Sequence, residues 1–402
     1  MLRKIITLAI MRLCIAIAFA AFPPKSTVAM ADTVRVATFN VSLNRRNAGD
    51  LLADIKARNA QVLAIAEIIQ RVRPDILLIN EFDFDEQALA AFQTLLTQPQ
   101  NTLGHSSASP MSYEHHFSAP TNTGVPSGYD LDGNAEIGGP RDSYGFGYFP
   151  GQYGMAVLTR YPITATRTFQ TFLWRDMPNN LMPKEFLRPD AVQVFRLSSK
   201  SHWDLTLDID GVPLHFLTAH PTPPVFDGPE DLNGRRNHDE IRLWADYIAD
   251  AAYIYDDMGR SGGLNPGQHF VIAGDLNADP FDGDSVPNAI GQLLDHPLIN
   301  GSDRTAPASE GATKASLRQK GANLSHKGAA RFDTADFGYD RDAPGTDRAP
   351  GNLRVDYVLP SRSLDVIDAG VFWLSPSDPL FELAEYPTSD HRLVWIDLAV
   401  PE

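Results

Sequence analysis

Short apolar segments alternate with amphipathic ones along this chain, and this alternation restricts the fold more than any other feature of the sequence. Residues 56–72 place apolar side chains such as Leu63 and Ile68 at helical spacing, and residues 75–80 form an apolar strand. Of the 402 residues, 43% are hydrophobic and 21% are charged, which is ordinary for a globular protein. We therefore predict a buried sheet covered by helices.

The same pattern continues along the chain and predicts a single domain. No internal repeat and no Pro/Ser-rich linker divides the sequence, but residues 97–152 and 301–352 are long, irregular and rich in small or polar residues. Stretches of this length are usually functional or disordered, and because both run into polar motifs we expect walls of an active site. Further strands are predicted at 34–39, 155–159, 205–209, 214–218, 270–273, 355–359 and 393–398, and further helices at 84–96, 238–252 and 286–294.

The first 31 residues differ from the rest of the sequence. Basic residues surround an apolar run and no acidic residue occurs there, which is typical of a secretory signal peptide. The Ala29–Ala31 pattern favours cleavage before Asp32, and Ala18–Ala20 is an alternative site. The run is shorter than the ~20 residues of a membrane span, which argues against the alternative of an uncleaved anchor. We expect an exported protein, periplasmic or extracellular, without a transmembrane anchor after cleavage and with a mature domain at residues 32–402.

Composition excludes several chemistries. The only cysteine, Cys14, lies in the predicted signal peptide, so the mature chain would have no thiolate nucleophile, disulfide or Cys-ligated zinc. Residues 1–31 hold four of the 34 basic residues and none of the 50 acidic ones, so their removal changes the formal net charge from −16 to −20. Because phosphate neutralisation supplies most non-specific affinity for nucleic acid, this charge disfavours tight binding of duplex DNA.

Five short motifs place polar residues where an apolar strand ends or begins. Carboxylates, amides and imidazoles would thus gather along one rim of the predicted sheet, and Asp275 and Asn277, two apart on an extended segment, would point the same way. Taken singly, these residues have structural alternatives: Asn40 could form a turn, Asp275 could cap a helix and Asp356 could pair with Arg354. The motifs are Thr38-Phe39-Asn40, Asn80-Glu81-Phe82, Thr218-Ala219-His220, Gly274-Asp275-Leu276-Asn277 and Ser389-Asp390-His391.

The order of these motifs, with Arg354-Val355-Asp356-Tyr357 before the last, resembles the endonuclease/exonuclease/phosphatase superfamily. This superfamily includes pancreatic-type deoxyribonucleases, apurinic-site endonucleases, inositol-polyphosphate phosphatases and bacterial sphingomyelinases. Each motif alone is weak, but five in this order, each at a strand end, are specific. The resemblance covers essentially the whole mature chain. It implies an α+β fold, a four-layer α/β/β/α sandwich of two mixed β-sheets flanked by helices.

The resemblance also implies a metal-dependent active site. Glu81 would be the principal ligand of Mg²⁺ or Mn²⁺, bound as one ion or two, with Asn40 and Asp390 nearby. Hard cations prefer such oxygen ligands and keep waters for the substrate phosphate. The metal would therefore lie on the same rim as the remaining motifs.

Roles for the other polar residues follow from the same resemblance, in an in-line hydrolysis without a covalent intermediate. Asp275 would orient or deprotonate the attacking water, and Asn277 would donate a hydrogen bond to a phosphoryl oxygen. His391, held by Asp356, would bind the phosphate as an imidazolium. His220 would bind it from the other side or protonate the leaving oxygen.

Three further residues are candidate substrate contacts. Tyr153 precedes the predicted strand 155–159 at a place where relatives carry a Tyr or an acid, with packing in a wall as the alternative. Arg235 and Arg236 follow a proline-rich segment after His220 and fall near a predicted helix N-terminus, where backbone amides favour an anion. The alternative for the two arginines is a surface pair that balances nearby acids.

One acidic segment resembles a metal site but fails its pattern. Asp130-Leu131-Asp132-Gly133-Asn134 is similar to the start of a calcium loop. Arg141 occupies the twelfth position, where such a loop needs a bidentate Glu. We therefore predict a turn.

Together these features predict a monomeric metal-dependent phosphoesterase whose phosphate-ester substrate is small or lipid-like. Residues 97–152, residues 301–352 and the segment 221–226 would form three walls of a pocket that excludes a stiff polyanion. A secreted non-specific nuclease is the alternative within the class. A catalytically inactive binding module on the same fold is the alternative from another class, and it predicts gaps in the motifs that this sequence does not show.

Overall fold

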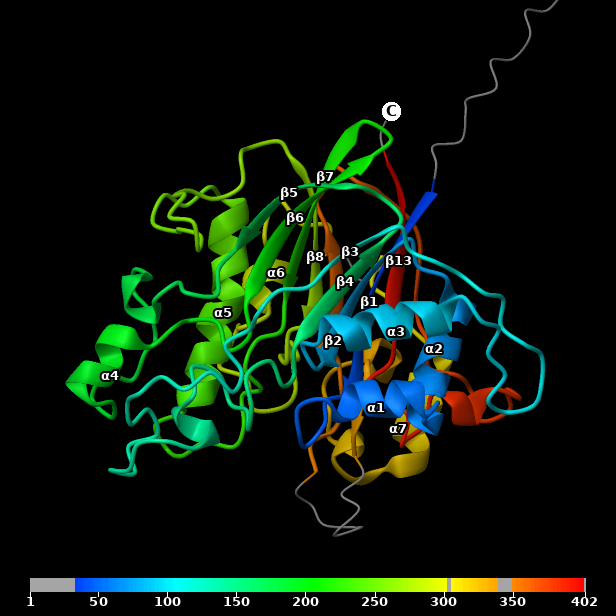
Figure 1. Ribbon diagram of the computed structural model, residues 1–402, viewed down its shortest axis with the longest axis horizontal. Coiled ribbons are helices and arrows are strands. Elements are labelled where there is room, and N and C mark those ends of the chain that lie inside the picture. Colours follow the sequence, from blue (N-terminus) through cyan, green and yellow to red (C-terminus); the bar gives the residue numbers. More distant parts are fainter. Residues whose placement is uncertain (1–32, 302–304, 339–348, 401–402) are drawn as a thin grey trace, which may run out of the picture. The chain divides into compact units, whose positions relative to one another are not determined.

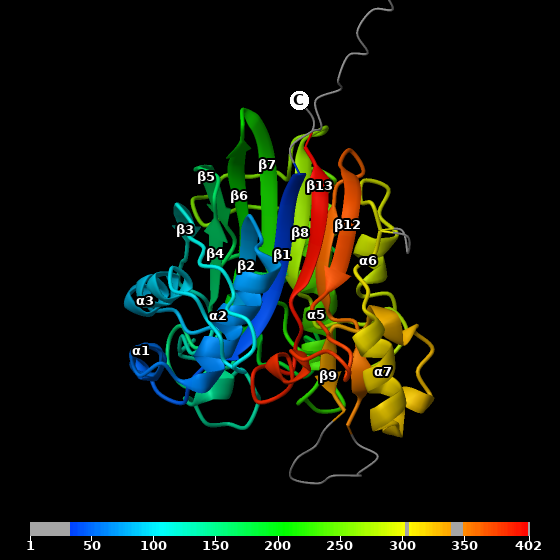
Figure 2. The ribbon, with the colours of Figure 1, turned by 90° about the vertical axis from the view of Figure 1, so that its right-hand side faces the viewer.

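Two β-sheets form the centre of the fold (Figures 1 and 2). Their strands are β1 (Thr33–Leu43), β2 (Ile76–Phe82), β3 (His115–Phe117), β4 (Met155–Thr159), β5 (Ile163–Thr168), β6 (His202–Ile209), β7 (Val212–Ala219), β8 (His269–Asp275), β11 (Asp356–Pro360), β12 (Asp365–Val371) and β13 (Val394–Ala399). The first sheet has the order β12-β13-β1-β2-β4-β3, and the second has the order β11-β8-β7-β6-β5. The pairs β1/β2 and β7/β8 are parallel and their neighbours are antiparallel, so both sheets are mixed.

The sheets pack face to face through apolar side chains that point inward from both. Leu78 and Val157 of the first sheet share a buried cluster with Leu205 and Val271 of the second. Outside the first sheet lie α1 (Asp50–Lys56), α2 (Ala60–Val72) and α3 (Glu86–Leu96), and outside the second lie α5 (Leu232–Ile248) and α6 (Gly291–Leu294), as Figure 1 shows. The predicted four-layer α/β/β/α sandwich is confirmed.

Capping residues place the helix boundaries differently from the predicted ones. The predicted helix 56–72 begins only at Ala60 because Arg58 adopts a left-handed φ of 54° and the Asn59 side chain accepts the backbone N–H of Gln61 as the N-cap of α2. At α3, the Asp85 side chain accepts the N–H groups of Gln87 and Ala88 in the same way. Periodicity therefore located the helices, and short-range capping contacts determined their ends.

The two long stretches contain more regular structure than predicted. Residues 97–152 include β3, and residues 301–352 include α7 (Glu310–Gln319) and a two-stranded sheet of β9 (Ala335–Phe337) and β10 (Gly351–Leu353). The Ser309 side chain caps α7 by accepting the N–H of Ala312. The expectation of irregular structure in residues 301–352 was wrong because three-residue strands and a polar ten-residue helix leave little periodicity to detect.

Strand directions bring distant parts of the sequence to one edge of the sandwich. The parallel strands β1 and β2 end together, as do β7 and β8 in the second sheet. Strand β11 runs antiparallel to β8, which makes Asp356 the register partner of Asp275. The Asn40 side chain of the first sheet donates to Asp275 of the second across 3.0 Å. The two edges therefore face each other and form one rim.

The computed structural model describes residues 33–301, 305–338 and 349–400. The predicted signal peptide, residues 1–31, lies outside the described residues, as does its cleavage site. Within the described ranges, no helix has the length and hydrophobicity that would let it cross a membrane.

Candidate active site

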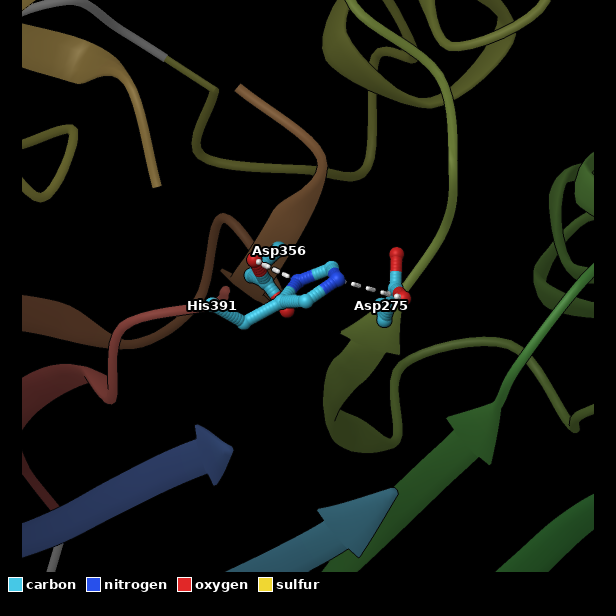
Figure 3. Close-up of side chains that lie close together, drawn as sticks. All are labelled: Asp275, Asp356 and His391. Carbon is cyan, nitrogen blue, oxygen red and sulfur yellow. Dashed lines mark hydrogen bonds and ion pairs between the residues drawn. The ribbon is translucent and has the colours of Figure 1, made fainter. Parts of the chain in front are cut away.

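Asp275, at the end of β8, is the centre of the rim (Figure 3). Its Oδ2 atom accepts a hydrogen bond from Asn40 Nδ2 at 3.0 Å and lies 3.5 Å from Nε2 of His220 and 3.6 Å from Nε2 of His391. The other ring nitrogen of His391, Nδ1, lies 2.9 Å from Oδ2 of Asp356. Ligand atoms of Asp275, Asp356 and His391 lie within 4.8 Å of one another, so this group could also hold an ion. Five of the predicted residues thus converge.

Burial and mutual charge separate the protonation states of these groups. Burial raises the pKa of Asp275 to about 7, and the charge of Asp356 contributes to the rise although His391 opposes it. For His391, burial lowers the pKa, but Asp356 and Asp275 together raise it well above its ordinary value. Burial and the charges of Lys200 and His391 hold the pKa of His220 well below its ordinary value. These shifts favour the protonated state for His391 and the neutral state for His220. The two predicted roles of His220, as a second imidazolium or as the group that protonates the leaving oxygen, stay predictions.

Beside Asp275, two carboxylates form a candidate cation site. Glu81 accepts hydrogen bonds from Asn40 Nδ2 at 3.1 Å and Asn44 Nδ2 at 2.7 Å, while Asp390 accepts one from Ser42 Oγ at 2.8 Å. Burial raises the pKa of Glu81 and the charge of Asp390 raises it further. Two carboxylates that repel each other in this way would be stabilised by a cation between them, and oxygen ligands suit a hard divalent ion.

Backbone strain occurs at this same position. Glu81 has a φ of 56°, although it has a long side chain and lies within strand β2. Residues in this left-handed region cost free energy unless the surrounding structure enforces them, and they cluster at functional sites. The parallel register between β1 and β2 also shifts between Asn40 and Leu43. Irregular backbone on both strands therefore accompanies the amide and the carboxylate of the candidate cation site.

Asn277 and Tyr153 lie near this centre in conformations that the sequence did not predict. Asn277 follows β8 in a left-handed turn with a φ of 52°, and its N–H donates to Oδ1 of Asp275. The expectation that it extends the strand was wrong; its Nδ2 donates to the carbonyl of Pro221, which leaves a second amide hydrogen for another acceptor. For Tyr153, burial raises the pKa and the charge of Glu81 raises it further, so its hydroxyl lies within the electrostatic reach of Glu81.

The arginine pair does not join the other predicted residues. Helix α5 begins at Leu232, so Arg235 and Arg236 lie inside the helix and not before it. Arg236 is buried, and its guanidinium donates to the backbone carbonyls of Leu197, Tyr144 and Arg196. Arg235 faces Glu185 at 3.8 Å. The predicted substrate clamp is therefore wrong for Arg236, because its donors already satisfy the interior of the protein.

Both long stretches reach the rim. The ring of Phe337, on β9, packs edge-on against His391 with 5.3 Å between ring centroids, and the N–H of Asp336 donates to the carbonyl of Asp390. On the other side, Gln152 Nε2 donates to the carbonyl of Arg45, just after β1. The expectation that both stretches form walls of the site stays a prediction.

The acidic segment at Asp130 forms a turn, as predicted. Carboxylate oxygens of Asp130, Asp132 and Asp142 lie within 4.8 Å of one another. Those of Asp130 accept the backbone N–H groups of Gly133 and Ala135, among others, and Asp142 accepts two more amides. The backbone thus satisfies the buried acids of this cluster without any ion.

Sequence reasoning missed three residues at the rim. Ser42 lies in β1 and Asn44 directly follows this strand, at alternate positions after Asn40, and this period of two could have identified them. Lys200 precedes β6 outside any motif, and no local pattern marks it. Its charge nevertheless acts on the pKa of both Glu81 and His220, which places it at the site.

Several solved structures are similar to this chain. Among solved structures, an endonuclease/exonuclease/phosphatase from Beutenbergia cavernae has 18% sequence identity and a TM-score of 0.50, covering 92% of this chain and 72% of its own. A family protein from Leptotrichia buccalis has 14% identity and a TM-score of 0.47, with 91% and 100% covered. Sphingomyelinase C from Streptomyces griseocarneus has 14% identity and a TM-score of 0.46, with 91% and 99% covered.

No curated protein matches the sequence. The sequence model of the family described as "Endonuclease/Exonuclease/phosphatase family", however, matches residues 37–391, which span every predicted site residue from Asn40 to His391. Members of this family are hydrolases, most of them dependent on divalent metal ions. The chain therefore belongs to the endonuclease/exonuclease/phosphatase family.

Proposed function

We propose that this chain is an exported, divalent-metal-dependent phosphoesterase that cleaves phosphodiester or phosphomonoester bonds by in-line attack of an activated water. The observation that carries the proposal is the position of Asp275. Its carboxylate lies within 3.6 Å of His220 and His391, and the Asn40 amide that donates to it also donates to Glu81, whose pKa the charge of Asp390 raises. A base, an imidazolium and a cation site are thus available around one point.

The metal would be held by Glu81 and Asp390, with Asn40 orienting Glu81. When bound, Mg²⁺ or Mn²⁺ supplies positive charge that polarises a phosphoryl oxygen of the substrate. The pKa of Glu81, which burial and Asp390 raise, means that the protein alone does not stabilise the ionised carboxylate well. Such a weakly stabilised carboxylate is typical of a site in which a bound cation balances the negative charge.

The remaining residues divide the proton chemistry among them. Asp275, with a pKa of about 7, would accept the proton of the attacking water at neutral pH. His391, protonated and held by Asp356, would donate from Nε2 to a non-bridging phosphoryl oxygen. The second amide hydrogen of Asn277 would donate to the same group and stabilise charge in the transition state. His220, as a neutral imidazole, would act as a hydrogen-bond donor.

We propose small or lipid-like phosphate esters as the substrates, and we propose that the protein acts as a monomer. The predicted mature charge of −20 repels a polyanion. Phe337 covers one side of His391, which narrows the approach to the rim. A flexible headgroup can enter such an approach more easily than a stiff duplex can.

A substrate and metal panel tests the proposal. Bis-nitrophenyl phosphate, nitrophenyl phosphate, phospholipid vesicles and supercoiled plasmid are each incubated with Mg²⁺, Mn²⁺, Ca²⁺ or chelator. We expect activity to vanish in chelator and to return with Mg²⁺ or Mn²⁺, and the small diester to be cleaved faster than plasmid at equal phosphate concentration. A full rate after exhaustive metal removal would contradict the metal site. Plasmid nicking that outpaces diester cleavage and slows with salt would indicate a nuclease, and inactivity on the whole panel would favour a binding module.

A further inference from the structure

Lys200 is a buried cation that the mechanism above does not use. It lies two residues before β6, and His220 follows β7; because His202 pairs with Ala219, both residues leave the β6/β7 hairpin at the same end. Only 7% of Lys200 is exposed. Its ammonium makes no hydrogen bond or ion pair with any residue in the described ranges.

Glu240 of α5 holds the backbone on both sides of this hairpin end. One of its carboxylate oxygens accepts the N–H of Ser199 at 2.6 Å, and the other accepts the N–H of Thr222 at 2.6 Å. Glu240 itself is fully buried. Through Glu240, helix α5 therefore fixes the main chain close to Lys200 and close to His220 at the same time. Both side chains extend from backbone that is held by the same carboxylate.

The surroundings of Lys200 connect it to the active site. Burial lowers the pKa of its ammonium, and the charges of Glu240, Glu81 and Asp275 oppose that effect, in this order. Its charge in turn lowers the pKa of His220. A largely buried ammonium that has no acceptor among the described residues can form a charge-assisted hydrogen bond with an oxygen of a bound anion.

We propose that Lys200 is a substrate-binding residue whose ammonium contacts a phosphoryl oxygen on the His220 side of Asp275. This inference rests on the proposed function in that the bound group is a phosphate. It explains how a protein of net charge −16 can offer an anion a local cation besides the metal and His391. The recognised chemistry is a phosphoryl group, whatever molecule carries it.

Binding of inorganic phosphate tests the proposal without requiring turnover. Isothermal titration calorimetry of the Mg²⁺-loaded full chain would compare wild type with Lys200→Met, Lys200→Arg and a control, Lys314→Met, whose ammonium pairs with Glu310 on α7. A charge-assisted hydrogen bond corresponds to ~10- to 100-fold in affinity, and we expect this loss in Lys200→Met. Lys200→Arg should retain part of the affinity, and the control should bind as wild type does.

Further measurements separate this inference from the proposed function. Circular dichroism and thermal melting establish that each variant is folded; should Lys200→Met fail to fold, Lys200→Gln provides the neutral substitution. With bis-nitrophenyl phosphate, KM should rise more than kcat falls. A folded neutral variant that binds phosphate as tightly as wild type overturns the role of Lys200, as does a wild type that binds no phosphate. Phosphate binding that depends on Lys200 in a protein inactive on every ester supports this inference while the proposed function fails.

Discussion

Two buried aspartates, Asp275 at the rim and Asp256 in the loop before β8, have opposite surroundings. Asp256 accepts hydrogen bonds from the guanidinium groups of Arg167 and Arg260 and from the backbone N–H groups of Met258 and Arg260. Burial alone would raise its pKa, but these donors lower it below the ordinary value. At Asp275, burial raises the pKa to about 7, because the charge of His391 and the Asn40 amide, which lower it, do not offset burial and the charges of Asp356 and Glu81.

The difference between the two aspartates shows that burial does not by itself mark a functional acid. At Asp256 the protein supplies four donors, which makes the carboxylate part of the structure. At Asp275 the protein supplies fewer hydrogen-bond donors, and burial leaves the carboxylate dependent on a cation or a proton. The number of donors around the carboxylate therefore distinguishes Asp275 from Asp256.

Substituting each aspartate gives the largest expected contrast. Asp275→Asn should lower kcat for bis-nitrophenyl phosphate by ~10²- to 10⁴-fold because the general base is lost. Asp256→Asn should leave kcat close to that of wild type but reduce the free energy of unfolding by ~3 kcal/mol, because two arginines lose their buried acceptor. Enzyme kinetics and urea unfolding measure the two effects. Near-normal turnover in Asp275→Asn would remove this residue from the mechanism.

The metal dependence sharpens the contrast within the rim itself. Glu81→Gln should raise the Mg²⁺ concentration required for half-maximal rate by ~10- to 100-fold, because a charged ligand is lost. Asp275→Asn, measured at its residual rate, should require nearly the same Mg²⁺ concentration as wild type. Magnesium titrations of the rate give both values. An equal shift in both variants would show that the two acids hold the ion together.

A double substitution tests whether the histidine and its carboxylate act as one unit. Asp356 orients His391 through a 2.9 Å hydrogen bond, so the losses from Asp356→Asn and His391→Ala should be non-additive. We expect the double variant to be little slower than His391→Ala alone. If its loss equals the product of the two single losses, Asp356 has only a structural role.

The pH dependence of stability should have opposite signs at the two aspartates. The folded pKa of Asp275 is raised from 3.8 to about 7, so its contribution to stability is complete below pH 3.8 and is lost as the pH rises through about 7. The folded pKa of Asp256 is lowered, so the contribution of Asp256 to stability is present above pH 3.8 and is lost as the pH falls through this folded pKa. In chelator, the free energy of unfolding of Asp275→Asn should increase by ~1–4 kcal/mol relative to that of wild type as the pH rises from about 4 to about 8. Urea unfolding measures this difference across the pH range. A difference between variant and wild type that does not change with pH would show that the pKa of Asp275 is not raised in the folded protein.

Much of the site followed from local sequence. Asn40, Glu81, His220 and Asp275 each end an apolar strand, and parallel strands end at the same edge of a sheet, so their convergence was predictable. Roles that depend on charged groups from other parts of the chain were not predictable from local sequence. The neutral state of His220 arises from burial and from the charges of Lys200 and His391, residues far from it in sequence.

The sequence by itself determined the fold class, the family and the order of the strand-end motifs, because these depend on periodicity and on residues close together in the chain. Tertiary structure alone decided the protonation states, the burial of Arg236 and the position of Lys200. Each of these depends on how many donors and charges other elements bring to a buried group. Such long-range electrostatics leaves no periodic trace in a sequence, and only the packing of two sheets and α5 produces it.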